Sequence, residues 1–260
     1  MIITEIQYFF SKIIRFQAIF KDTVEFTCAL EFKISSQRRL PMSATYNEML
    51  KRLIEERKRL GLSQQQMARL VHITQSNYSK VEKGLHRLSY EELKYLSKAN
   101  IDIFYIFTGY RCAGKYVAYF QQCAYVELCC YLGIIYLLIV LNDCRSNTEQ
   151  WKDIVKRVKY VPLVLDCKKS SNIFLVIRHT TCSRQKSMAE KLGVDIKKFR
   201  ELEKDRCLPD SEIIWKLYNL FHISPAVVLK DKNSMINEIS SLLEAAEENG
   251  AEIMDIIKQI

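Results

Sequence analysis

The sequence has few of the residues that build metal sites and common catalytic centres. It contains only four histidines, and its nine cysteines include no Cys-x-x-Cys pair and none at ligand spacing from a histidine. A zinc site is therefore not expected. The chain also lacks a nucleotide-binding loop, a catalytic-triad spacing and a paired-carboxylate site. We expect no cofactor, no metal ion and no enzyme activity.

Signals for export and for membrane insertion are also missing. The first basic residue, Lys12, follows Glu5 and lies inside an apolar stretch, which is not the order found in a targeting peptide. Because the cysteine number is odd and no export signal is present, we expect reduced thiols and a cytoplasmic protein. The most apolar stretch, 116–142, is split by Glu127 and leaves only 15 uncharged residues, whereas a membrane helix needs about 20. We predict a buried helix or helical hairpin there, and no membrane span.

The composition is that of a folded protein with a basic surface. The chain has 39 lysines and arginines against 30 acidic residues, and 48% of its residues are hydrophobic. A net charge of +9 suits a polyanionic partner but does not identify one. A length of 260 residues leaves room for two small domains and their connections.

The most informative pattern is that of two short helices joined by a tight turn. Ser63 and Thr74 are N-cap candidates, because their hydroxyls can accept hydrogen bonds from free backbone N–H groups of a first turn. Tyr78 and Val81 lie three residues apart and face inward, and Gly84 supplies the left-handed residue that ends a helix. The second helix therefore presents an outer face of polar residues. These are Gln75, Ser76, Ser79 and Lys80.

Helix–turn–helix geometry with an exposed, hydrogen-bonding second helix is predicted by a dense, ungapped set of residues. The set consists of Ser63, Gln64, Ala68, Thr74, Gln75, Ser76, Ser79, Lys80, Val81, Glu82, Lys83, Gly84 and Arg87. In these positions the chain resembles the Cro/phage-repressor, or XRE-like, family of helix–turn–helix domains. The resemblance covers about Tyr46 to Gly109, a domain of five helices. It departs from the family at His72, where a glycine is usual, and histidine tolerates the left-handed backbone better than most residues.

The resemblance implies a sequence-specific DNA-binding transcriptional regulator that reads the major groove with the helix Gln75–Lys83. Gln64 would bond a backbone phosphate and brace Gln75, and Gln75 would contact a base edge, preferably adenine. Ser76 and Lys80 would contact neighbouring bases. The expected phosphate contacts are Asn77, Ser79 and Arg87. The alternative is an adaptor or antitoxin-like protein-interaction module in which DNA binding is secondary or lost.

The pattern returns without a gap 121 residues further along the chain. Met67 and Ala68 become Met188 and Ala189, and the glycine expected at the turn is present as Gly193. The acidic and basic residues that end the second helix also recur. An internal repeat at a fixed interval predicts a second, degenerate domain of the same kind.

The predicted outer face of this second copy differs from that of the first. Ile196, Lys197 and Glu201 stand where the first copy has Gln75, Ser76 and Lys80. A carboxylate facing a groove walled by phosphates predicts repulsion, although it could accept a hydrogen bond from cytosine. We therefore expect either non-specific or weak DNA contact, or a purely structural or partner-binding role. The candidate contacts are Gln185, Lys197, Lys198 and Arg200.

The predicted fold is all-α, with two lambda-repressor-like helix–turn–helix domains at 46–110 and 172–230. An apolar helical connector is expected at 111–171, and an acidic amphipathic helix at 231–260, which has seven acidic residues against two lysines. Expected partners are double-stranded DNA and a second copy of the chain as a homodimer. A protein partner would bind through 116–142 or through the C-terminal helix.

The N-terminal extension, 1–45, has two interpretations. If Arg38 and Arg39 are encoded by AGG codons, the DNA there resembles a bacterial ribosome-binding sequence placed for a start at Met42. Residues 1–41 would then come from an over-extended gene prediction. The alternative is a real N-terminal helix that packs on the first domain.

Overall fold

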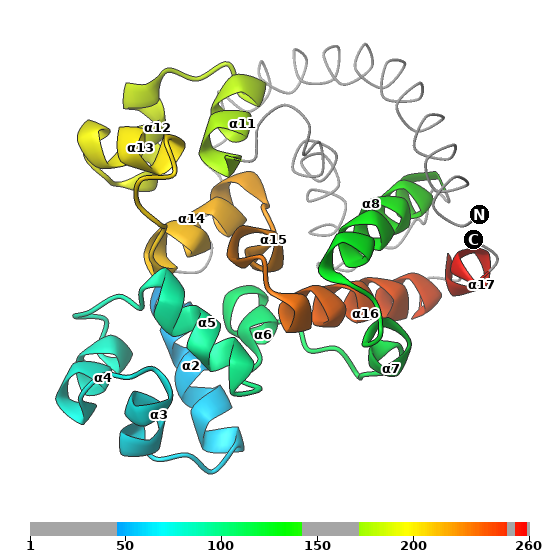
Figure 1. Ribbon diagram of the computed structural model, residues 1–260, viewed down its shortest axis with the longest axis horizontal. Coiled ribbons are helices and arrows are strands. Elements are labelled where there is room, and N and C mark those ends of the chain that lie inside the picture. Colours follow the sequence, from blue (N-terminus) through cyan, green and yellow to red (C-terminus); the bar gives the residue numbers. More distant parts are fainter. Residues whose placement is uncertain (1–45, 142–171, 249–252, 259–260) are drawn as a thin grey trace. The chain divides into compact units, whose positions relative to one another are not determined.

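The computed structural model describes residues 46–141, 172–248 and 253–258, which form α-helices and connections without a strand (Figure 1). This part of the chain agrees with the predicted all-α fold. The described residues belong to one compact unit. The predicted extension, 1–45, and the second half of the predicted connector, 142–171, lie outside the described residues.

The first helix set occupies the segment in which the helix–turn–helix was predicted. Its apolar side chains meet in one core, where Leu53, Met67 and Tyr78 are fully buried. Short connections join the helices around this core (Figure 1). The set consists of α2 (Tyr46–Arg59), α3 (Gln64–Leu70), α4 (Gln75–Glu82), α5 (Tyr90–Lys98) and α6 (Ile103–Thr108).

Side-chain caps begin both helices of the helix–turn–helix. The Ser63 hydroxyl accepts a hydrogen bond from the Gln66 backbone N–H at 3.2 Å, and the Gln66 side chain accepts one from the Ser63 N–H at 2.7 Å. Thr74 accepts a hydrogen bond from the Asn77 N–H at 3.2 Å. These bonds satisfy N–H groups that have no partner within their own helix. Both predicted N-caps are therefore confirmed.

Two residues of the first helix set have the left-handed backbone expected from the sequence. His72 lies in the turn between α3 and α4 with φ +59°, and Gly84 follows α4 with φ +74°. A left-handed backbone costs a residue with a side chain about 1–2 kcal/mol. The ring of His72 packs edge-on against Tyr95 with centroids 4.6 Å apart, which offsets part of that strain.

The second helix set repeats the first in order, and α12 and α13 begin 121 residues after α3 and α4. At the turn Gly193 has φ +66°, and Asp205 has φ +54° at the position of Gly84. Phe199 and Leu202 are buried where the first set buries its own apolar residues. The set consists of α11 (Ile173–Thr180), α12 (Gln185–Leu192), α13 (Ile196–Glu203), α14 (Ser211–Phe221) and α15 (Pro225–Leu229).

The remaining described helices form a second core. These are α7 (Val117–Phe120), α8 (Tyr125–Leu141), α16 (Lys232–Glu248) and α17 (Ile253–Ile257). The apolar stretch thus forms α7 and α8, and α8 packs along α16. The acidic tail forms two helices, and α16 is buried on several sides, where even Glu238 is inaccessible to solvent. Among the described helices, none combines the length and apolarity needed to cross a bilayer.

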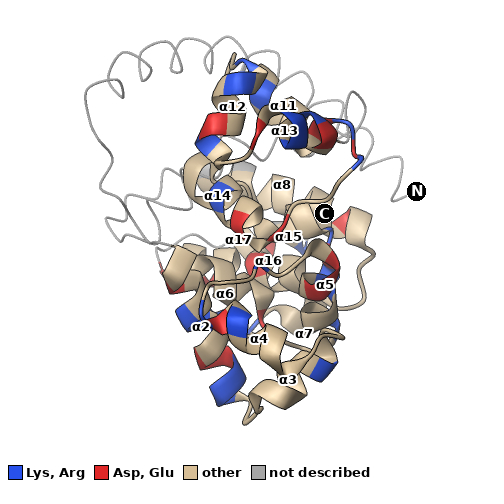
Figure 2. Cartoon of the chain, turned by 90° about the vertical axis from the view of Figure 1, so that its left-hand side faces the viewer, with Lys and Arg blue, Asp and Glu red and all other residues tan. Residues whose placement is uncertain are grey.

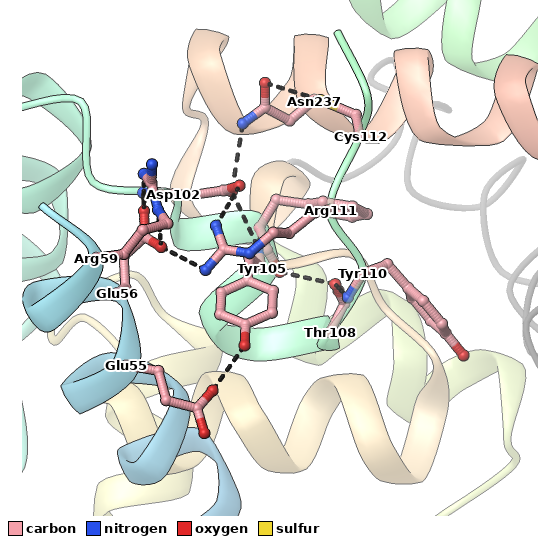
Figure 3. Close-up of polar contacts among 11 residues, drawn as sticks. Glu55, Glu56, Arg59, Asp102, Tyr105, Thr108, Tyr110, Arg111, Cys112 and Asn237 are labelled. Atoms are coloured by element: carbon pink, nitrogen blue, oxygen red, sulfur yellow. Dashed lines mark hydrogen bonds and ion pairs between the residues drawn. The ribbon is translucent and has the colours of Figure 1, made fainter.

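A buried carboxylate joins the first helix set to the chain that follows it (Figure 3). Glu56 is fully buried and accepts hydrogen bonds from Arg59 at 2.8 and 2.9 Å, from Arg111 at 2.6 Å and from the Asp102 N–H at 3.2 Å. The Arg111 guanidinium also lies 3.5 Å from the centre of the Tyr105 ring. Burial opposes ionisation of Glu56, but the two arginines hold its pKa below the ordinary value. Burial raises the pKa of Asp102.

Candidate nucleic-acid interface

The outer face of α4 consists of polar side chains on the solvent side of the helix. Gln75, Ser76, Asn77 and Lys80 are exposed, and Ser79 is half-buried. Within the described part of the chain, none of these side chains has a hydrogen-bond or ion-pair partner. The face can therefore bind a ligand without first breaking an internal side-chain contact.

The inner side of α4 is fixed by the Glu82 cluster, which consists of Arg57, Gln64 and Glu82. Arg57 in α2 and Gln64 at the start of α3 each donate a hydrogen bond of 2.7 Å to the Glu82 carboxylate. Arg57 also donates to the Leu62 carbonyl at 2.8 Å. The Glu82 side chain is only 7% exposed, so water competes little for these bonds. The cluster attaches the end of α4 to both preceding helices.

Gln64 therefore has a partner that the sequence did not predict. Its amide nitrogen donates to Glu82, and no bond between Gln64 and Gln75 occurs among the described residues. An amide nitrogen carries two hydrogens, and one remains for a phosphate oxygen. The phosphate contact of Gln64 and its support of Gln75 stay predictions.

Arg87, the third expected phosphate contact, is paired with an acidic residue of the second helix set. Its side chain is 57% exposed, and its Nε donates to Glu212 in α14. Glu212 also accepts a hydrogen bond from Lys216 at 2.7 Å. Burial opposes ionisation of Glu212, but these two cations hold its pKa below the ordinary value. A phosphate would compete with Glu212 for Arg87, and the predicted DNA contact stays a prediction.

The second helix set contains the same kind of cluster at corresponding positions. In the Glu203 cluster, Arg178 and Gln185 both donate to Glu203, and the Gln185 bond is 2.5 Å long. The Glu203 side chain is 5% exposed. Arg57 and Arg178 occupy corresponding positions, 121 residues apart. The sequence does not indicate their role, because only the fold brings Arg57 to the end of α4 and Arg178 to the end of α13.

The outer face of α13 differs chemically from that of α4. Ile196 is 37% exposed, and Lys197 and Arg200 are exposed beside it along the helix. The Glu201 carboxylate lies 3.7 Å from the Arg206 guanidinium, which compensates its charge. The repulsion expected between Glu201 and a phosphate is therefore reduced by an internal partner.

Three of the four contacts predicted for the second copy already have internal partners. Lys198 donates to Asp210 at 3.1 Å, and Arg200 Nε donates to the amide oxygen of Gln185 at 3.2 Å. Lys197 has no such partner among the described residues. Of this set, Lys197 is thus the most accessible cation, and all four DNA contacts stay predictions.

Both helix sets carry the same balance of charge. Residues 46–109 and 172–230 each contain 11 lysines and arginines against 7 acidic residues. In Figure 2, α12 and α13 carry basic residues with acidic ones near them. The second helix set therefore has a net basic charge equal to that of the first, although its outer face has Ile196 and Glu201 in place of an amide and a lysine.

Comparison with known proteins identifies the first helix set. A helix-turn-helix family model matches residues 53–99, from the middle of α2 to the end of α5. The matched segment includes the entire outer face of α4 and the Glu82 cluster. The matching family is of the Cro/C1, or XRE, type, and the match supports DNA binding and transcription regulation as functions of this segment. No curated protein and no solved structure matches the chain.

The matched segment ends before the second helix set begins. What the two sets share is the helix order, the turn, the buried apolar residues and the two ion-pair clusters. The assignment of the second set as a degenerate domain of the same family is therefore a proposal.

Proposed function

We propose that the chain is a sequence-specific DNA-binding transcriptional regulator that reads the major groove with Gln75–Lys83. The observation that carries this proposal is the outer face of α4, whose polar side chains are free while the helix beneath them is fixed by the Glu82 cluster. Rigid support matters because base recognition needs donors and acceptors held at defined positions.

Within this proposal each side chain has a stated role. Gln75 donates and accepts hydrogen bonds at an adenine edge, and Lys80 donates to guanine in the neighbouring base pair. Ser76 contacts a base on the same face. Asn77 and Ser79 bind phosphates and hold the helix in the groove, without sequence preference.

We propose further that the second helix set is a degenerate copy of the first. Its support is the Glu203 cluster, whose three residues match the Glu82 cluster at a constant interval. Lys197 supplies the main phosphate contact of this copy. Gln185, Lys198 and Arg200 contribute only when DNA displaces their internal partners.

The test is selection of bound fragments from a random DNA pool with the full chain, followed by titration of the selected duplex. Gln75→Ala and Lys80→Ala should each weaken binding to that duplex by about 1–3 kcal/mol. Lys51→Ala, which removes an exposed charge from α2, is the matched control and should change affinity little. Because all three side chains are exposed, the melting temperature should stay unchanged.

An absence of any enriched sequence would count against the proposal. Equal affinity of the parent protein for selected and scrambled duplexes would have the same meaning. Either result, with a folded protein, would favour the adaptor or antitoxin-like function.

A further inference from the structure

The two helix sets contact each other through corresponding helices. At the interval of the repeat, α5 corresponds to α14 and α6 corresponds to α15. α5 contacts α15, and in return α14 contacts α6, while α6 and α15 contact each other; α14 also contacts α2. In Figure 1 these four helices lie between the pair α3 and α4 and the pair α12 and α13. Thus α5 meets the counterpart of α6, and α6 meets the counterpart of α5. Reciprocal contacts of this kind are the pattern of a twofold interface between identical subunits.

The connection that precedes α5 meets the first residue of α14 in a buried group of hydrogen bonds. The Ser211 N–H donates to the Leu88 carbonyl at 2.8 Å, and the Leu88 N–H donates to the Ser211 hydroxyl at 3.1 Å. The same hydroxyl oxygen lies 2.7 Å from the hydroxyl oxygen of Tyr46. Ser211 is fully buried, and burial raises the pKa of Tyr46 to about 12. These groups therefore stay neutral and paired at physiological pH.

Apolar packing joins the two helix sets as well. Buried residues of both sets belong to one continuous core, and the Tyr90 hydroxyl in α5 donates to the Leu229 carbonyl in α15 at 2.8 Å. Tyr46 also packs edge-on against Trp215 with centroids 6.2 Å apart. Separating the sets would expose apolar surface and break buried hydrogen bonds, so we expect them to move as one body.

We propose that this single chain is an internal pseudo-dimer, whose two helix sets bind the two halves of one DNA site. The inference rests on the proposed function and extends it to the form of the operator. Two-fold related helix–turn–helix units bind half-sites about one helical turn apart, and the symmetry of the site follows that of the protein. Here the two units belong to one chain and replace the expected homodimer.

The two halves of the proposed site differ because the outer faces differ. The amide of Gln75 favours adenine in the first half, whereas the exposed side chain of Ile196 favours the methyl group of thymine at the corresponding position. Lys197 holds a phosphate beside it, and Glu201 remains paired with Arg206. The operator is thus two-part and asymmetric, with stronger base selection in the half bound by α4.

The first experiment measures how many chains occupy a selected duplex and which bases they protect. One chain per duplex by sedimentation, with two blocks protected from hydroxyl radicals about 10 base pairs apart, is the expected result. Two chains per duplex, each protecting one block, would overturn the inference and leave the proposed function intact. One chain that protects a single block would overturn it as well. Failure to select any sequence would overturn the proposed function and this inference together.

The second experiment changes the spacing of the two halves. Inserting about 5 base pairs, half a helical turn, moves the second half to the opposite face of the duplex. Because the helix sets move as one body, affinity should fall to that of a duplex whose second half is scrambled. Unchanged affinity after the insertion would show that the sets bind independently and would refute the pseudo-dimer.

The third experiment exchanges the outer-face residue of α13. Ile196→Gln gives the second set the amide of the first, so selection should now return adenine in both halves and a more symmetric site. Leu220→Gln, on an exposed position of α14, makes the same chemical change away from the proposed interface and should leave the selected site as it was. An unaltered second half in Ile196→Gln would show that α13 does not read bases.

Discussion

Replacing Glu82 by glutamine removes the charge that holds α4 and preserves the size of the side chain. In the structure Glu82 accepts hydrogen bonds from Arg57 at 2.7 and 3.4 Å and from Gln64 at 2.7 Å. Glutamine keeps one acceptor oxygen but replaces the other with an NH2 group. That donor would face the N–H donors of Arg57 and Gln64. Arg57 keeps its bond to the Leu62 carbonyl, so its charge is not left without a partner.

The expected loss follows from these contacts. A hydrogen bond to a charged group contributes about 1.5–3 kcal/mol, and removal of one partner of a buried ion pair costs about 3–5 kcal/mol. Because Arg57 is 14% exposed and keeps a second acceptor, the loss should lie near the lower bound, about 2–3 kcal/mol. For a protein of this size that lowers the melting temperature by roughly 4–12 °C.

The repeat supplies the control, Glu203→Gln. Glu203 has corresponding partners and similar burial, so this variant should lose a similar amount of stability in chemical denaturation. The two variants should differ in DNA binding. Glu82→Gln loosens the helix that carries Gln75 and should weaken base discrimination in the selected site, whereas Glu203→Gln should weaken it less. Unfolding of Glu82→Gln within about 1 °C of the parent would refute the claim that this cluster holds α4.

Three further predictions follow from single contacts. Glu212→Gln should release Arg87 for DNA, raise affinity and steepen the slope of log affinity against log salt by about 0.9, measured by anisotropy titration; an unchanged slope contradicts this. Gly193→Ala should lower the free energy of unfolding by about 1–2 kcal/mol in a denaturant titration, because φ there is +66°. Because the pKa of Glu56 is lowered, its contribution to the free energy of unfolding should be constant above the ordinary pKa of 4.5 and decrease as pH falls below that value. The difference in unfolding free energy between the parent and Glu56→Gln measures that contribution, and equal differences at pH 7 and pH 3 would contradict it.

Local structure in the first helix set followed from the sequence because its causes are local. The caps at Ser63 and Thr74 and the left-handed residues His72 and Gly84 each involve groups within a few residues along the chain. Hydrogen bonds of this range depend on neighbouring residue types and so can be predicted from them. The polar outer face of α4 was predictable for the same reason, since helical periodicity separates it from the core.

Long-range partners could not be predicted in this way. Nothing near Arg87 in the sequence indicates that its guanidinium contacts Glu212. Gln64 was expected to contact a phosphate, whereas in the structure its amide donates to Glu82. The tail was predicted as an amphipathic helix, but α16 is covered on several sides because α8 supplies an apolar surface along it. The two side-chain pairings join residues 18 and 125 positions apart, so they depend on how the helices pack and not on neighbouring residue types.

The two ion-pair clusters explain how two helix sets of the same order can carry different outer faces without losing the fold. In the first set the scaffold positions Gln75 and Lys80, and in the second the same scaffold positions Ile196 and Glu201. The outer residues make no core contact, so their replacement changes what the helix can bind and leaves its stability largely unaltered. In a homodimer such a replacement would change both half-sites at once. In the proposed pseudo-dimer each half changes alone, which makes an asymmetric DNA site the expected target of this chain.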